Sequence, residues 1–190
     1  MSNPDAGHPP PPVADTDRRT LVLDSAMLTF ARFGYRKTSM EEVARAADIS
    51  RPGLYFLFSS KEALFRAAVT QALERDIAAV EHVLADTGRP LAERLVEAFD
   101  QWAGRYIGPL AHDVAAVVED NPGLLGEIAE TAPRRFEELV TGAVAAESGR
   151  DAAPLIAQTL ISASIGLKHQ AASRQFYLGR LRAAVGLLVR

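Results

Sequence analysis

The sequence has 190 residues, of which 48% are hydrophobic, and a formal net charge of −3 at pH 7. A chain of this length and composition can bury the core of one domain, or of a small domain joined to a larger one. It contains no cysteine, which excludes disulfides, thiol chemistry and cysteine-based zinc sites. The first residues lack a signal-peptide pattern and no apolar run is long enough to span a membrane, so we expect a cytoplasmic protein without membrane contact.

Charge is unevenly distributed along the chain. Residues 16–70 carry nine Lys or Arg against six Asp or Glu, so the remainder of the chain is acidic. A basic front favours contact with a polyanion, although chance scatter over a solvated surface produces the same counts. Residues 1–16 are polar and proline-rich without periodicity, and we expect a disordered tail there.

The rest of the chain has the periodicity of helices. A helical pattern begins near Arg18 and ends at Gly34, and a short second helix is capped by Thr38 or Ser39. A long helix begins near residue 61, and further amphipathic or apolar segments follow, separated by Gly and Pro. No segment alternates as a strand does, so the predicted fold class is all-α, with roughly eight to ten helices.

The stretch DISRPGLYFLF, which begins at Asp48, places Pro and Gly at the front of a short aromatic helix. Ser50 is the expected cap, and proline is tolerated in a first turn because its missing N–H has no partner there. Leu54 and Phe58 are four residues apart and are expected to face the core. The front of this helix is therefore slim and positively charged.

Two short capped helices joined by a tight turn have the length of a helix-turn-helix, whose second helix reads bases in the major groove. The candidate DNA-binding residues are Arg36, Lys37, Thr38, Ser39, Ser50, Arg51, Pro52, Gly53, Tyr55, Phe56 and Lys61. We expect Arg51 and Tyr55 to make most contacts and DNA shape to contribute the rest. The alternative is an ordinary three-helix corner of an α-bundle, with the aromatic residues in its core.

The sequence ARFGYRKTSMEEVARAADISRPGLYFLFSSKEALF resembles the DNA-binding domain of the TetR (tetracycline-repressor) family. The resemblance covers about residues 20–65 without gaps, with Asp48 where glycine is commoner. It implies an all-helical homodimer that binds operator DNA, usually as a repressor released by a small molecule. We expect an N-terminal helix-turn-helix DNA-binding domain over residues 17–63 and a helical effector-binding and dimerisation domain over residues 64–190.

The back half offers candidates for an effector site and a dimer interface. Phe99, Trp102 and Tyr106 form an aromatic stripe, which is typical of a core as well as of a pocket. The candidate effector residues are Phe99, Trp102, Tyr106, His112, Phe136 and His169, and the expected effector is small and apolar or aromatic. Members of the resembled family pair through their last two helices, which makes Ile156, Leu160, Leu181, Val185 and Leu188 candidate dimer contacts. The alternative is that these residues pack within one subunit.

The predicted function is therefore a homodimeric transcriptional repressor that binds a palindromic operator and is not an enzyme. No cofactor or metal is expected, because no two histidines lie four residues apart on a helix. The alternative is an all-α small-molecule-binding protein or enzyme whose front helices are structural. The absence of a glycine-rich phosphate loop and of paired His and carboxylate residues counts against it. A repressor that senses no ligand has the same sequence features.

Overall fold

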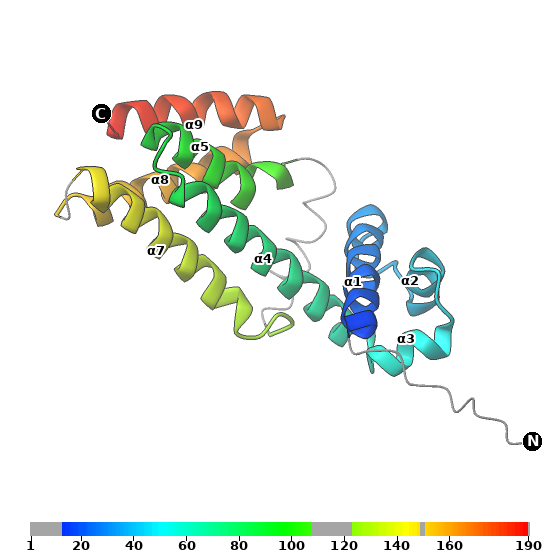
Figure 1. Ribbon diagram of the computed structural model, residues 1–190. Helices are drawn as coiled ribbons and strands as arrows, with labels where there is room; N and C mark the ends of the chain where they lie inside the picture. The colour runs from blue at the N-terminus through cyan, green and yellow to red at the C-terminus, as the bar shows by residue number, and fades with distance from the viewer. Residues whose placement is uncertain (1–12, 108–122, 149–150, 190) are drawn as a thin grey trace, which may run out of the picture. The chain divides into compact units, whose positions relative to one another are not determined.

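The computed structural model describes residues 13–107, 123–148 and 151–189. These residues form eight α-helices and one short 3-10 helix, with no strand among them, and this confirms the predicted all-α class. They belong to two compact units, divided between Ala68 and Val69 (Figure 1). Across the described segments, no helix combines the length and the apolar character that a bilayer crossing requires.

The first unit contains α1 (Val13–Phe33), α2 (Met40–Ala46), α3 (Arg51–Leu57) and the first turns of α4 (Lys61–Ala85). Helix α1 begins earlier than its periodicity indicates, within the expected disordered tail. Residues 1–12 of that tail lie outside the described residues. The core of this unit consists of buried side chains from all four helices: Val22, Phe30, Val43, Leu54, Leu64 and Phe65.

Side-chain caps define where the short helices begin. Ser39 caps α2: its hydroxyl accepts from the N–H of Glu42 at 3.2 Å, and its own N–H donates to the Glu42 carboxylate at 2.7 Å. This capping box satisfies two N–H groups that a helix leaves free, and these hydrogen bonds to Ser39 lower the pKa of Glu42. Ser50 caps α3, as the sequence predicts, by accepting from the N–H of Gly53 at 3.1 Å.

The turn between α2 and α3 depends on Asp48, whose φ of 53° lies in the left-handed region. Aspartate adopts this conformation at a lower cost than most residues with a side chain. The backbone then doubles back, and the N–H of Ile49 donates to the carbonyl of Ala44 at 3.0 Å. The turn directs α3 so that Leu54 is completely buried.

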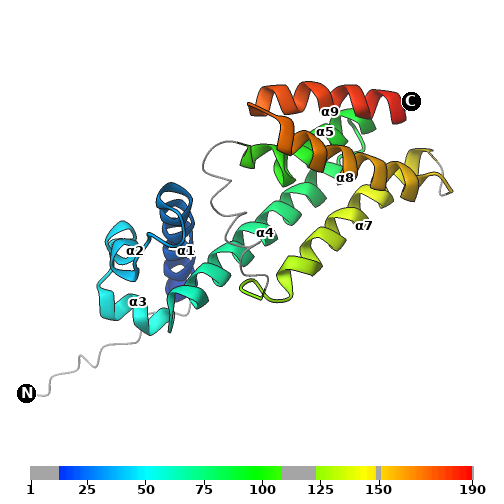
Figure 2. The ribbon, with the colours of Figure 1, turned by 180° about the vertical axis from the view of Figure 1, so that it is seen from behind.

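The second unit contains the rest of α4, together with α5 (Leu91–Trp102), η1 (Gly104–Tyr106), α7 (Ile128–Ser148), α8 (Ala153–Gln170) and α9 (Arg174–Leu188). Helix α8 packs against α7 and α9, and α9 also packs against α5 (Figure 2). Within the core, the hydroxyls of Ser164 on α8 and Tyr177 on α9 lie 2.7 Å apart. Burial raises the pKa of Tyr177 to about 12, so its hydroxyl stays protonated and available for this hydrogen bond.

Arg94 on α5 is the largest buried polar side chain of the described core, at 2% exposed. Its guanidinium donates to the carbonyl of Leu84 at 2.7 Å, to the carbonyl of Arg89 at 3.0 Å, and to the carboxylate of Glu147. The first two acceptors lie at the end of α4 and in the turn before α5. One cation therefore joins this turn to α7.

We predict that Arg94→Met lowers the free energy of unfolding by about 2–3 kcal/mol, because two carbonyls lose their donor in a site shielded from water. Urea unfolding followed by circular dichroism measures the change. The matched control is Arg89→Met: Arg89 has a side chain 39% exposed that pairs with Glu97 at 2.8 Å. An exposed pair of this kind contributes about 0–1 kcal/mol. Equal losses from the two variants would contradict the role given to Arg94.

Candidate functional site

The outward face of α3 groups four exposed side chains. Leu54 is completely buried and Phe58 is 3% exposed, which confirms that these two residues face the core. Because a helix turns once in 3.6 residues, burial of these two positions on one face leaves the residues of the remaining face exposed to solvent. The exposed residues are Arg51, Pro52, Tyr55 and Phe56. The alternative in which Tyr55 and Phe56 belong to the core does not hold, since they are 43% and 89% exposed.

The front of α3 is narrow because Gly53 leaves room for the cap. A Cβ atom at this position would lie 3.1 Å from the Ser50 hydroxyl oxygen, which is closer than most such contacts. The guanidinium of Arg51 lies 5.7 Å from the centre of the Tyr55 ring, so the charge and the phenol are neighbours. Ser39 and Ser50 are exposed, but their hydroxyls accept helix N–H groups and so position α2 and α3.

The loop that leads into α2 contains Arg36, Lys37 and Thr38. Arg36 and Lys37 are exposed, whereas Thr38 is 2% exposed and donates its hydroxyl to the carbonyl of Gly34 at 2.8 Å. The Thr38 N–H also donates to Gly34, at 3.2 Å. Both donors of Thr38 are therefore used within the loop, and the structure gives this residue a local structural role.

Lys61, at the start of α4, holds this loop in place. Its ammonium donates to the carbonyls of Tyr35 and Thr38, each at 3.1 Å, and lies 4.5 Å from the centre of the Tyr35 ring. The Tyr35 ring in turn packs against Phe65, with ring centres 4.8 Å apart. These contacts span 23 and 26 residues of sequence, and the motif alone did not predict them.

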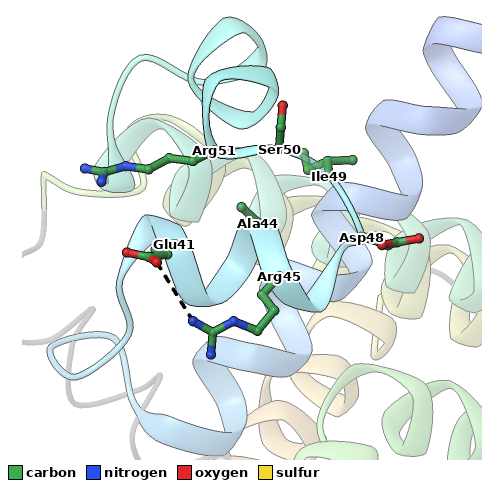
Figure 3. Close-up of a pocket in the computed structure, with 7 residues that line it drawn as sticks. All are labelled: Glu41, Ala44, Arg45, Asp48, Ile49, Ser50 and Arg51. Carbon is green, nitrogen blue, oxygen red and sulfur yellow. Dashed lines mark ion pairs between the residues drawn. The ribbon is translucent and has the colours of Figure 1, made fainter.

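A hollow of about 480 Å³ lies between α2 and the front of α3 (Figure 3). It is lined by Glu41, Ala44, Arg45, Asp48, Ile49, Ser50 and Arg51. Arg45 pairs with Glu41 at 3.9 Å, so part of its charge is neutralised within the chain. Arg51 lies on the opposite side of the hollow from this pair.

In the second unit, three of the predicted effector residues come together. The rings of Trp102 and Phe136 stack with centres 4.9 Å apart and planes inclined by 11°. Phe99 meets Phe136 edge-on at 5.0 Å, and both phenylalanines are buried. His169 is exposed in the last turn of α8, and His112 lies outside the described residues.

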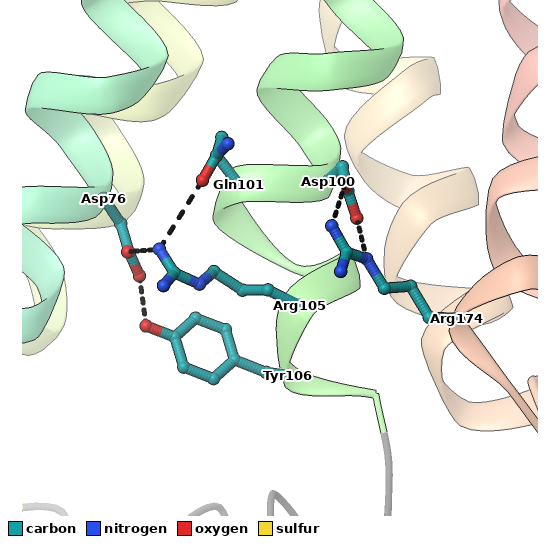
Figure 4. Close-up of polar contacts among 6 residues, drawn as sticks. All are labelled: Asp76, Asp100, Gln101, Arg105, Tyr106 and Arg174. Atoms are coloured by element: carbon teal, nitrogen blue, oxygen red, sulfur yellow. Dashed lines mark hydrogen bonds and ion pairs between the residues drawn. The ribbon is translucent and has the colours of Figure 1, made fainter.

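Tyr106 takes part in a polar cluster around Asp76 (Figure 4). Asp76 on α4 is 1% exposed; it accepts from the Tyr106 hydroxyl and from the Arg105 guanidinium, the latter at 2.9 Å. Burial raises the pKa of Asp76, and burial together with the adjacent carboxylate raises the pKa of Tyr106. Sequence reasoning missed Asp76, although a charged residue among Leu73, Ile77 and Val80 of α4 was an available signal.

A second polar pair lies beside this cluster in Figure 4. Arg174, at the start of α9, donates to the Asp100 carboxylate at 2.7 Å. The pair fills the space next to Gly104, where a Cβ atom would lie only 2.3 Å from an Asp100 carboxylate oxygen and 3.1 Å from the Tyr177 ring. The chain turns closely here because residue 104 has no side chain.

The predicted dimer contacts differ in their surroundings. Leu160, Leu181 and Val185 are at most 1% exposed and pack in the subunit's own core, while Ile156 and Leu188 are partly buried against it. The alternative left open by the sequence, packing within one subunit, therefore applies to the three buried residues. The last two helices instead expose Leu155, Ile165, Phe176 and Leu187.

Comparison with known proteins finds a family match for residues 22–68. Residues 22–68 match the model of the family described as bacterial regulatory proteins, tetR family. The HTH-type transcriptional regulator RutR of Escherichia coli is 37% identical over 57 residues, and the HTH-type transcriptional repressor ComR of the same organism is 39% identical over 57 residues. Each match covers 30% of this chain and 27% of the relative, so the chain matches less than a third of the length of these proteins.

The likeness in fold extends to both units. The crystal structure of a TetR-family transcriptional regulator from Mesorhizobium loti superposes with a TM-score of 0.75 at 18% identity, over 92% of this chain and 96% of that one. At this identity the likeness shows the fold alone. Together with the family match, it confirms the helix-turn-helix predicted from DISRPGLYFLF: residues 22–68 belong to the tetR family of bacterial regulatory proteins, and the described chain shares the fold of the Mesorhizobium loti structure.

Proposed function

We propose that this chain is a homodimeric transcriptional repressor that binds a palindromic operator through α3 and is released by a small apolar or aromatic effector. The observation that carries the proposal is the outward face of α3, where Arg51 and Tyr55 are exposed beside a capped, narrow helix front. A guanidinium can donate to both acceptors of guanine in the major groove. Arg36 and Lys37, exposed in the preceding loop, supply charge for phosphates.

In this proposal Lys61 contributes mainly through position. Its ammonium already has two carbonyl acceptors at 3.1 Å, which hold the loop in front of α2. Loss of Lys61 would release that loop and remove a positive charge, and neither effect depends on base sequence. The proposed role of Arg51 differs, because a side chain that contacts base edges makes binding depend on base sequence.

We predict that Arg51→Ala lowers the preference for operator over scrambled DNA by about tenfold, since a two-pronged contact to guanine discriminates by about 1–3 kcal/mol. Lys61→Ala is expected to weaken binding to both DNAs by the same factor. Fluorescence anisotropy with a duplex selected from a random library, at two salt concentrations, measures both effects.

The control for this experiment is Arg134→Ala, which removes a positive charge on α7 from a side chain that is 75% exposed. It should leave both affinities close to those of the unaltered chain. Equal loss of preference from the Arg51 and Lys61 variants would contradict the roles assigned to them. The absence of any enriched sequence in the selection would refute the proposed function.

The proposed dimer uses the faces of α8 and α9 that the subunit leaves exposed. Leu155 is 70% exposed and Ile165 57% on α8, and Leu187 is 73% exposed on α9. A Cβ atom at Gly166 or Gly186 would meet nothing within 4 Å, so a second pair of helices can approach these faces closely. A helix-turn-helix of this size gains specificity from binding two half-sites, which supports a symmetric dimer.

We predict that Ile165→Glu and Leu187→Glu each convert the dimer to a monomer, because they place a charge in the centre of an apolar contact. Sedimentation equilibrium gives the mass directly. Leu28→Glu is the matched control, since Leu28 is 72% exposed on α1 in the first unit, and this variant should remain dimeric. An unaltered chain that sediments as a monomer would exclude the dimer.

The proposed effector site centres on the stack of Trp102 and Phe136. Aromatic side chains next to a polar group are typical of a site for an apolar molecule with one hydrogen-bonding group. In the proposed site this group is the hydrogen-bonded pair of Asp76 and Tyr106, and Tyr106 follows Trp102 by four residues in the chain. Asp76 lies on α4, the helix whose first turns belong to the other unit. An effector that changes the contacts of α4 would alter the presentation of α3 to DNA.

We predict that small aromatic compounds that release the operator also change the fluorescence of Trp102, the only tryptophan of the chain. The two titrations should have the same midpoint, because one binding event causes both effects. Trp102→Phe should lose the signal and retain release. Compounds that release DNA without any response from Trp102 would place the effector elsewhere.

A further inference from the structure

The four exposed residues of α3 form two ridges of different chemistry. Arg51 and Tyr55 are four residues apart and make one ridge, and Pro52 and Phe56 are four residues apart and make the other. Residues at this spacing lie one above the other on a helix. The first ridge can donate hydrogen bonds, whereas neither side chain of the second can donate or accept one.

Phe56 is unusual even among exposed apolar residues. At 89% it is more exposed than any other large hydrophobic side chain of the described residues, where the next values are 73% for Leu187 and 72% for Leu28. Its neighbours Leu54 and Phe58 show that α3 has an interior face for apolar residues. The register of the helix nevertheless directs Phe56 away from the interior and onto the outward face of α3.

We propose that Phe56, flanked by Pro52, recognises the C5-methyl group of thymine in the major groove. This inference rests on the proposed function, because it takes α3 as the helix that enters DNA. The thymine methyl is the apolar group that base pairs present in the major groove, and a phenylalanine side chain is suited to contact it. Insertion between base pairs is the other contact available to a phenyl ring. That contact requires unstacking and is made from the minor groove, into which α3 is not expected to fit.

In this proposal the two ridges recognise different chemical groups of the bases. Arg51 and Tyr55 select acceptors, and Phe56 selects a methyl group at an adjacent position, so the preferred half-site combines guanine with neighbouring thymine. The contact is strengthened by removing both the Phe56 ring and the thymine methyl group from water. A cytosine at the same position buries less apolar surface, because its C5 carries hydrogen.

The experiment uses the full chain and a duplex selected from a random library. Each thymine of the half-site is replaced in turn by deoxyuridine, which removes the methyl group and keeps every hydrogen-bonding group. At one or two positions we expect the affinity, measured by fluorescence anisotropy, to fall roughly fourfold per methyl. Phe56→Ala should bind the thymine and uracil duplexes equally, and Phe56→Leu, which keeps an apolar side chain, should still distinguish them.

Phe33→Ala is the matched control, because Phe33 is 46% exposed on α1 and its loss removes the same atoms outside α3. This variant should retain the full difference between thymine and uracil. If the unaltered chain binds all uracil duplexes as tightly as the thymine duplex, the inference is overturned and the proposed function stands. A difference that persists in Phe56→Ala, or a selected half-site made only of G·C pairs, also overturns it. Failure to select any sequence overturns the proposed function as well.

Discussion

The arrangement of the first unit depends on the burial of Leu54 and Phe58, four residues apart on either side of one helical turn. A helix of seven residues has little stability by itself, because its few hydrogen bonds contribute less free energy than nucleation of the helix costs. The two apolar anchors and the Ser50 cap supply what the helix lacks. Burial of Leu54 and Phe58 also fixes the rotation of α3 about its own axis, and this rotation determines which side chains face solvent. The set of side chains that α3 would offer to DNA in the proposed function is thus a consequence of core packing.

Helix α4 supports both units with different kinds of contact. At its start, the ammonium of Lys61 bonds two loop carbonyls and covers the ring of Tyr35, so one side chain fixes the entry to α2. Farther along, Asp76 is buried with Tyr106 and Arg105 as its donors. A buried carboxylate is costly unless its partners are in place, so its contacts are sensitive to any molecule that competes for them. In the proposed function, α4 is the element through which an effector near Asp76 would influence α3, because both features lie on this one helix.

The last two helices show how the core of a subunit and the proposed dimer interface divide the apolar residues of the same helices. Leu160, Leu181 and Val185 complete the subunit's own core, and the residues left for a partner are those on the remaining faces, such as Ile165 and Leu187. Glycines on these faces expose backbone that another helix can approach. The proposed dimer therefore uses side chains that contribute little to the stability of one subunit, which keeps folding and pairing separable.

The sequence by itself determined the features that depend on near neighbours along the chain. Ser50 as a cap, Pro52 in a first turn and the buried spacing of Leu54 and Phe58 follow from backbone hydrogen bonding and helical periodicity, and the structure has each of them. Tertiary structure decided the features that involve distant residues. Lys61 meets carbonyls more than 20 residues away, and Asp76 meets a tyrosine 30 residues away. It also decided which sides of α8 and α9 are buried. Both helices have apolar side chains on more than one face, so their periodicity does not predict which face is buried. Packing of α8 against α7 and of α9 against α5 determines it.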